Sequence, residues 1–163
     1  MNKARIHLFP DTNLFFQCKD IGGLPWSDLG DFDEVELIVS RPIQKEIDRR
    51  KGETTTRLGK RARKAHGLLR DVISNKLNPI VLREKNPKIL LFLQVDLKPN
   101  AALATKLDYE EADDTLVGIT SGFATNNSEL DVGVLTHDGG VMGVRRHGGC
   151  GALCYSRNMA GAP

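Results

Sequence analysis

Short apolar runs alternate with amphipathic segments along the chain. Runs rich in aliphatic and β-branched residues are typical of strands buried in a parallel sheet. Such runs predict strands at residues 5–10, 35–40, 79–82, 89–95, 132–136 and 152–155. Between them, apolar residues recur every three or four positions, as on one face of a helix. This spacing predicts a short helix and a loop within 14–34, and helices at 42–51, about 56–75, 108–123 and 139–146.

Local signals mark where several of these helices begin. Pro42 suits a first helical turn, and the threonines at 54–56 offer a cap for the helix that follows. Asp108 and Glu111 have the spacing of a capping box. The apolar stripe behind that box consists of Ala112, Leu116, Ile119 and Phe123. Strands alternating with helices predict an α/β fold, a Rossmann-like three-layer α/β/α sandwich around a central, mainly parallel sheet.

Length and composition indicate one soluble globular domain. The chain has 163 residues, of which 40% are hydrophobic and 27% charged, and this excludes disordered, collagen-like and coiled-coil proteins. We expect a single domain over residues 1–155 and a loose tail, or a truncation point, at 156–163. The apolar run 89–95 is too short to cross a bilayer, and residues 1–15 lack a secretion signal. Three scattered cysteines favour a reducing compartment, so the expectation is a cytoplasmic protein without membrane contact.

The small net charge of +2 conceals two oppositely charged regions. Residues 41–64 contain ten Lys or Arg and three Asp or Glu. Residues 107–144 contain eight Asp or Glu and no Lys or Arg. The first region suits a polyanion, and the second suits metal cations.

Carboxylates from four parts of the chain are expected at one edge of the sheet. Asp11 and Asp138 follow predicted strands, while Glu46, Asp113 and Asp114 lie in the first turns of predicted helices. In an open parallel sheet these positions share the carboxyl edge, where ligands bind. Crowded carboxylates repel one another unless a cation compensates them, and hard oxygen ligands favour Mg²⁺ or Mn²⁺. Such ions can activate water against a phosphodiester.

Each acid also has a purely structural interpretation. Asp11 could cap the helix that begins near Leu14. Glu46 could pair with Arg49 or Arg50 on a solvated helix face. Asp138, which precedes two glycines, could be an ordinary turn residue.

Three stretches together resemble the PIN-domain nuclease family. They are Phe9-Pro-Asp-Thr-Asn13, Asp114-Thr-Leu-Val-Gly-Ile119 and Leu135-Thr-His-Asp-Gly139. Glu46 occupies the place of the helical glutamate of that family. The resemblance implies a PIN-like fold and a Mg²⁺- or Mn²⁺-dependent endoribonuclease. Its catalytic, metal-binding acids would be Asp11, Glu46, Asp114 and Asp138.

The residues around this quartet have further expected roles. Asp114 is preferred to Asp113 because small residues beyond it, including Gly118 and Ser121, would let the helix approach the sheet closely. Asp113 remains a candidate neighbouring ligand of the metal or its water. Asn13 and Thr136 are expected to orient Asp11 and Asp138 by hydrogen bonds.

Arg57, Lys60, Arg61 and Lys64 form one cationic stripe on a predicted helix, which is either a solvated face or a nucleic-acid-binding surface. Trp26, Phe15 and Phe16 are expected to pack in the core or a loop rather than to stack on bases. RNA is the expected partner, and DNA remains open. A non-catalytic module that binds RNA or protein is the competing interpretation. An antitoxin-like protein, further domains of a longer chain and a homo-oligomer also remain open.

Overall fold

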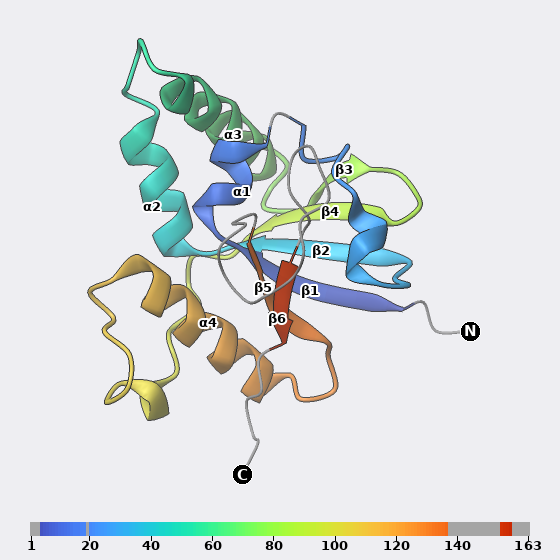
Figure 1. Cartoon of the computed structure of the whole chain (residues 1–163), viewed down its shortest axis with the longest axis vertical. Coiled ribbons are helices and arrows are strands. Elements are labelled where there is room, and N and C mark those ends of the chain that lie inside the picture. Colours follow the sequence, from blue (N-terminus) through green and yellow to red (C-terminus); the bar gives the residue numbers. More distant parts are fainter. Residues whose placement is uncertain (1–3, 19, 137–153, 158–163) are drawn as a thin grey trace.

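The structure is a computed structural model, and it describes residues 4–18, 20–136 and 154–157 (Figure 1). The strands of this part are β1 (Arg5–Pro10), β2 (Glu34–Val39), β3 (Ile80–Arg83), β4 (Lys88–Leu93), β5 (Val132–Thr136) and β6 (Cys154–Arg157). The helices are α1 (Thr12–Gln17), α2 (Arg41–Arg50), α3 (Arg57–Ser74) and α4 (Ala112–Asn126), with short 3₁₀ turns at Trp26–Leu29 and Ala101–Leu103. No helix in these residues has the length and apolar character that a membrane span requires.

The described strands form one sheet in the order β3-β4-β2-β1-β5-β6. β1 pairs in parallel with β2 and β5, and β2 pairs in parallel with β4. β3 and β6 are the antiparallel edge strands. The expectation of a central, mainly parallel sheet is confirmed, and the carboxyl ends of β1, β2, β4 and β5 lie along one edge.

Helices cover both faces of this sheet. The ring of Phe9 on β1 meets the ring of Phe123 on α4 edge to face, with centroids 5.3 Å apart. The neighbouring residues Ile6 and Leu8 point to the opposite face and are fully buried. Figure 1 shows α4 on one side of the sheet and α1 with α3 on the other. The three-layer α/β/α sandwich is therefore confirmed.

The apolar patterns located most elements closely. β1 and β5 have the predicted bounds, and β2 and α2 each begin one residue earlier than predicted. Trp26 belongs to the core, and its indole N–H donates to the carbonyl of Ile21 (2.9 Å). The hydroxyl of Thr56 accepts from the main-chain N–H of Gly59 (2.9 Å) and caps α3 as expected.

Two expectations about segment ends were wrong. The residue that precedes α4 is Glu111, whose side chain makes no cap, and the Asp108 carboxylate accepts from Glu110 N–H (3.0 Å) in a local turn instead of forming a capping box. Ser156 and Arg157 were assigned to a loose tail, but both belong to β6 and pair with β5. The predicted helix at 139–146 lies outside the described residues.

Candidate active site

Asp11 lies where β1 ends and α1 begins. Its main-chain N–H donates to the carbonyl of Leu135 on the neighbouring strand β5 (3.0 Å). Its carboxylate accepts from the N–H of Leu14 (3.3 Å) and so caps α1. The hydroxyl of Thr136 and the main-chain N–H of Asn13 also donate to this carboxylate. The structural interpretation of Asp11 as a helix cap is confirmed, and this cap sits on the carboxyl edge of the parallel strands.

Asn13 and Thr136 orient the acids differently from the sequence expectation. Asn13 acts on Asp11 through its main-chain amide. Thr136 was expected to support Asp138, but its hydroxyl bonds to Asp11. Asp138 itself lies outside the described residues. The end of β5 thus contributes directly to holding the carboxylate at the end of β1.

The environment of Asp11 raises the pKa of its carboxyl above the ordinary value of 3.8. Burial is the largest cause, because a carboxylate removed from water loses solvation. The hydrogen bonds from Thr136 and Leu14 partly offset this effect, while the negative charge of Asp113 adds to it. The sheet edge therefore brings together a partly buried carboxylate and a second acid that repels it.

Asp113 and Asp114 occupy different environments in the first turn of α4. Asp113 is exposed and acts electrostatically on Asp11. Asp114 accepts a hydrogen bond from the main-chain N–H of Asp108 (2.8 Å) and ties the helix to the segment before it. Of the two acids, Asp113 is the one whose negative charge raises the pKa of Asp11.

The reason given for preferring Asp114 was wrong. A Cβ on Gly118 would lie 2.5 Å from the Tyr109 ring, and the hydroxyl of Ser121 accepts a hydrogen bond from Asn100 Nδ2 (3.1 Å). These small residues therefore admit the segment 98–109, not the sheet. The residues three and seven positions beyond Asp113 are Leu116 and Thr120, and both are buried. The buried apolar residues of α4 were thus a better guide to the acid that acts on Asp11 than its small residues were.

Glu46 is bound by arginines of its own helix. Its two carboxylate oxygens accept from Arg49 Nη2 (2.8 Å each), and one also accepts from Arg50 Nε (3.1 Å). The hydrogen bond from Arg49 is the main cause that lowers the pKa of Glu46, and Arg50 adds to it. The alternative interpretation of Glu46 as part of a helix-face ion pair is confirmed, and a metal-binding role would require these contacts to rearrange.

Among the described residues, no group of three or more His, Cys, Asp or Glu side chains is arranged to hold a metal ion. The arrangement nevertheless suits a hard cation in two respects. Asp11 is a desolvated carboxylate next to the like charge of Asp113, and a divalent ion would relieve both costs. The atoms that these two carboxylates would offer a metal are oxygens, which Mg²⁺ and Mn²⁺ prefer as ligands.

The cationic stripe of α3 lines a cavity of about 810 Å³. All four residues of the stripe contribute to its lining: Arg57, Lys60, Arg61 and Lys64. The cavity also includes apolar side chains of α1 and β3, which no local pattern connected to the stripe. A helical charge pattern identified the cations, whereas the cavity depends on segments that are distant in sequence.

Comparison with known proteins finds no matching family model, no matching curated protein and no matching solved structure.

Proposed function

We propose that this chain is a metal-dependent endoribonuclease of the PIN-like type, with its site at the carboxyl ends of β1 and β5. The observation that supports this proposal best is the environment of Asp11. Its carboxylate is partly buried, receives donors from Thr136 and two main-chain amides, and is repelled by Asp113. Structural capping of a six-residue helix would not require a second acid beside it.

The proposed ligands of Mg²⁺ or Mn²⁺ are the acids of the resemblance, Asp11, Glu46, Asp114 and Asp138, together with Asp113. A bound ion would supply an acidified water and positive charge for the phosphate oxygens. Thr136 and the Asn13 amide would hold Asp11 in a fixed orientation. We favour Asp11 and Asp113 as the central pair, because the charge of Asp113 acts on Asp11 whereas the charge of Glu46 is already compensated by Arg49 and Arg50.

The substrate would be held by the cations of α3. Arg57, Lys60, Arg61 and Lys64 lie on one side of that helix and face a common cavity. Cations in this arrangement suit the phosphates of RNA or DNA, whose binding would weaken with salt by a slope of about 0.7 per neutralised phosphate of a single strand. We place the activity in the cytoplasm because the three cysteines of the chain are too scattered for a disulfide framework.

The proposal is tested by incubating labelled single-stranded RNA with the protein in Mn²⁺, in Mg²⁺ and in EDTA. Cleavage is expected in either metal and not in EDTA, with DNA of the same sequence as a parallel substrate. The Asp11→Asn variant should lose about 100-fold or more in rate, since loss of even an outer partner of a metal ligand costs about 10- to 100-fold. Asp71→Asn on the exposed surface of α3 is the matched control. Full activity of the Asp11→Asn variant would rule out a metal-dependent mechanism in which Asp11 is a ligand.

A non-catalytic nucleic-acid-binding module is the second candidate. The capture of Glu46 by Arg49 and Arg50 favours it, because one acid of the expected quartet is then neutralised by the protein itself. This candidate predicts RNA binding that EDTA does not change, and no turnover at any metal concentration.

A further inference from the structure

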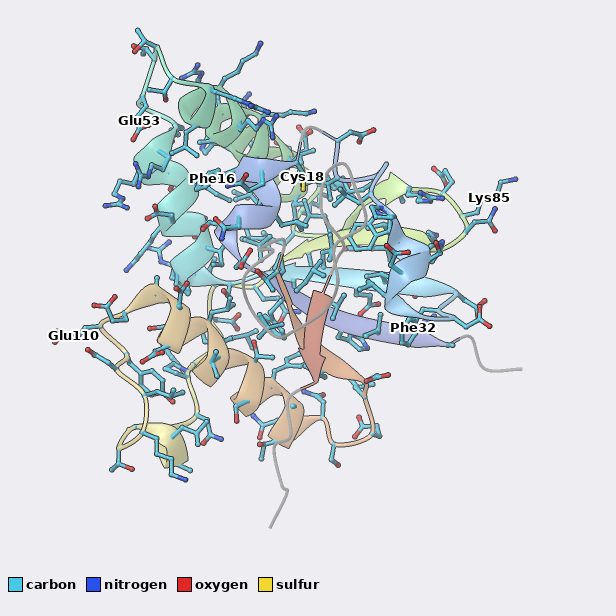
Figure 2. The ribbon with its side chains drawn as sticks, viewed as in Figure 1. Phe16, Cys18, Phe32, Glu53, Lys85 and Glu110 are labelled. Carbon is cyan, nitrogen blue, oxygen red and sulfur yellow. The ribbon has the colours of Figure 1, made fainter. Side chains whose placement is uncertain are left out.

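The cavity beside α3 combines two kinds of surface. Its apolar lining comes from Phe15, Ile21, Leu68 and Leu82, which belong to α1, the segment after it, α3 and β3. Its cations come from one helix: Arg57, Lys60, Arg61, Arg63 and Lys64. Asp20 is the one carboxylate among its described lining residues. Figure 2 shows Cys18, another lining residue, just after α1 and close to α3.

The segment after α1 and strand β3, which also line the cavity, are held together by contacts to main-chain carbonyls. The Arg83 guanidinium donates to the carbonyl of Gly22 (3.1 Å) and fixes the segment after α1 against β3. A Cβ on Gly22 would lie 2.4 Å from the carbonyl oxygen of Leu82, so glycine permits this close approach. The segment after α1 and strand β3 therefore keep a fixed position relative to each other where they line the cavity.

The cations differ in how much of their binding capacity is already used. Arg63 donates to the carbonyls of Lys51 and Glu53, and Arg61 donates one bond to the carbonyl of Phe16 (3.2 Å). The side chains of Arg57 and Lys60 are exposed and make no hydrogen bond or ion pair with any described residue, while the main-chain N–H of Lys60 donates to the carbonyl of Thr56 within the first turn of α3. These two side chains are thus available to an anion at the cavity.

We propose that this cavity binds one nucleotide, with its phosphate on Arg57 and Lys60 and its base against the apolar lining. An inorganic phosphate would leave the apolar lining unfilled. An acyl-chain anion would use the lining but would offer no donor to Asp20. A nucleotide supplies all three groups, since its base or ribose carries donors, and a cavity of about 810 Å³ is of the size that holds such a ligand.

The position of the cavity connects it to the candidate site. Asp11 caps the first turn of α1, while Phe15 and Cys18 line the cavity from the other end of that helix. A helix of six residues is about 9 Å long. If the nucleotide in the cavity belongs to an RNA chain, the adjacent nucleotides of that chain would therefore lie near Asp11. Nucleotide binding itself requires no hydrolysis, and only this link between the two sites rests on the proposed function.

The test is a titration of ¹⁵N-labelled protein in EDTA with adenosine 5′-monophosphate, adenosine and inorganic phosphate, followed by NMR. The monophosphate should shift amides of residues 15–18, 20–22 and 57–64. Its dissociation constant should be about tenfold or more below that of either fragment, which corresponds to independent contributions from both surfaces. Shifts elsewhere, or equal affinity for inorganic phosphate, would overturn the proposal.

Two charge reversals on the same helix give a matched comparison. Lys60→Glu should weaken binding of the monophosphate by about tenfold or more, because it replaces a cation by a repelling charge. Arg70→Glu, at an exposed position of α3 outside the cavity lining, should change it by less than about twofold. Equal effects of the two variants would contradict the proposal.

The outcomes separate this inference from the nuclease proposal. Nucleotide binding without RNA cleavage would support the nucleotide-binding cavity and rule out the nuclease proposal. RNA cleavage by a protein that does not bind the monophosphate would support the nuclease proposal and rule out nucleotide binding in the cavity.

Discussion

The hydroxyl of Thr136 donates a hydrogen bond to the carboxylate of Asp11, so side chains as well as main chains join the ends of β5 and β1. The two residues are 125 positions apart in the sequence and become neighbours only through the parallel pairing of these strands. Their contact fixes the orientation of a carboxylate whose charge is opposed by burial and by Asp113. Four predictions follow from these and related contacts.

The first concerns the stability of the Asp11→Asn variant. Because the folded state raises the pKa of Asp11, it binds a proton more readily than the unfolded state does. The wild-type contribution to stability is therefore present below the ordinary pKa of 3.8 and is lost as pH rises through the higher folded value. Asparagine caps helices as well as aspartate does and carries no charge. We expect the variant to have an equal or higher Tm than the wild type at pH 7.

The measurement is a series of thermal melts of both proteins in EDTA from pH 7 downward. The Tm difference should shrink as pH falls through the raised pKa of Asp11. A variant that is less stable than the wild type at pH 7 would show that the Asp11 charge stabilises the fold.

The second prediction separates Asp113 from Asp114 by their alanine variants. Asp114→Ala removes the acceptor for the Asp108 N–H and should lower the free energy of unfolding by about 1 kcal/mol. Asp113→Ala should be nearly neutral, because the loss of a favourable charge at a helix N-terminus is offset by relief of repulsion on Asp11. Urea unfolding in EDTA measures both. RNA cleavage should fall more in Asp113→Ala, and the reverse order would return the ligand role to Asp114.

The third prediction concerns Glu46. Arg49 and Arg50 lower the pKa of this carboxyl, so its stabilising effect is present above the ordinary value of 4.5 and is lost as pH falls through the folded value. Glu46→Gln should destabilise the protein by about 0.5 kcal/mol at pH 7, as expected for partly exposed helical pairs, and should have less effect in acid. Urea unfolding at several pH values measures this effect.

Activity provides the second readout for Glu46. We expect Glu46→Gln to reduce RNA cleavage less than Asp11→Asn does, because its charge is already compensated by arginines. Glu129→Gln, at an exposed position beyond α4, is the matched control. A loss as large as that of Asp11→Asn would indicate that Glu46 leaves its arginines to bind the metal.

The fourth prediction compares two glycines of α3. A Cβ on Gly59 would lie 1.6 Å from the carbonyl oxygen of Glu53, so Gly59→Ala must displace the turn that precedes the helix and should cost about 1–3 kcal/mol. Gly67 has open space around its Cα, and Gly67→Ala should stabilise the helix by about 0.5–1 kcal/mol. Chemical denaturation of both variants gives the comparison, and a stabilised Gly59→Ala would contradict the close contact.

Much of the fold could be predicted because its signals are local. Apolar runs bounded by polar residues located β1 and β5, and the hydroxyl of Thr56 marked the start of α3. The interpretation of Glu46 as an arginine partner was also local, since its partners are three and four positions away. Asp108 misled because its short side chain could serve either a helix cap or a turn.

The candidate site was only partly predictable. The position of Asp11 at a strand end indicated the edge where it lies, because strands that alternate with helices along the chain are expected to pair in parallel. The choice between Asp113 and Asp114 depended on which face of α4 meets the sheet and which meets the segment 98–109. One residue along a helix rotates the side chain by about 100°, so this choice needs the packing partners of both faces.

The amino-acid sequence by itself determined the succession of strands and helices, the sandwich that they form and the acids and cations available to a site. Only the tertiary structure decided that Thr136 supports Asp11, that Asp113 is the acid coupled to it, and that the α3 cations face an apolar cavity. The physical reason is the separation along the sequence over which each interaction acts. Hydrophobic periodicity acts between residues a few positions apart, whereas hydrogen bonds, charge repulsion and cavity walls join residues that only the folded chain brings together.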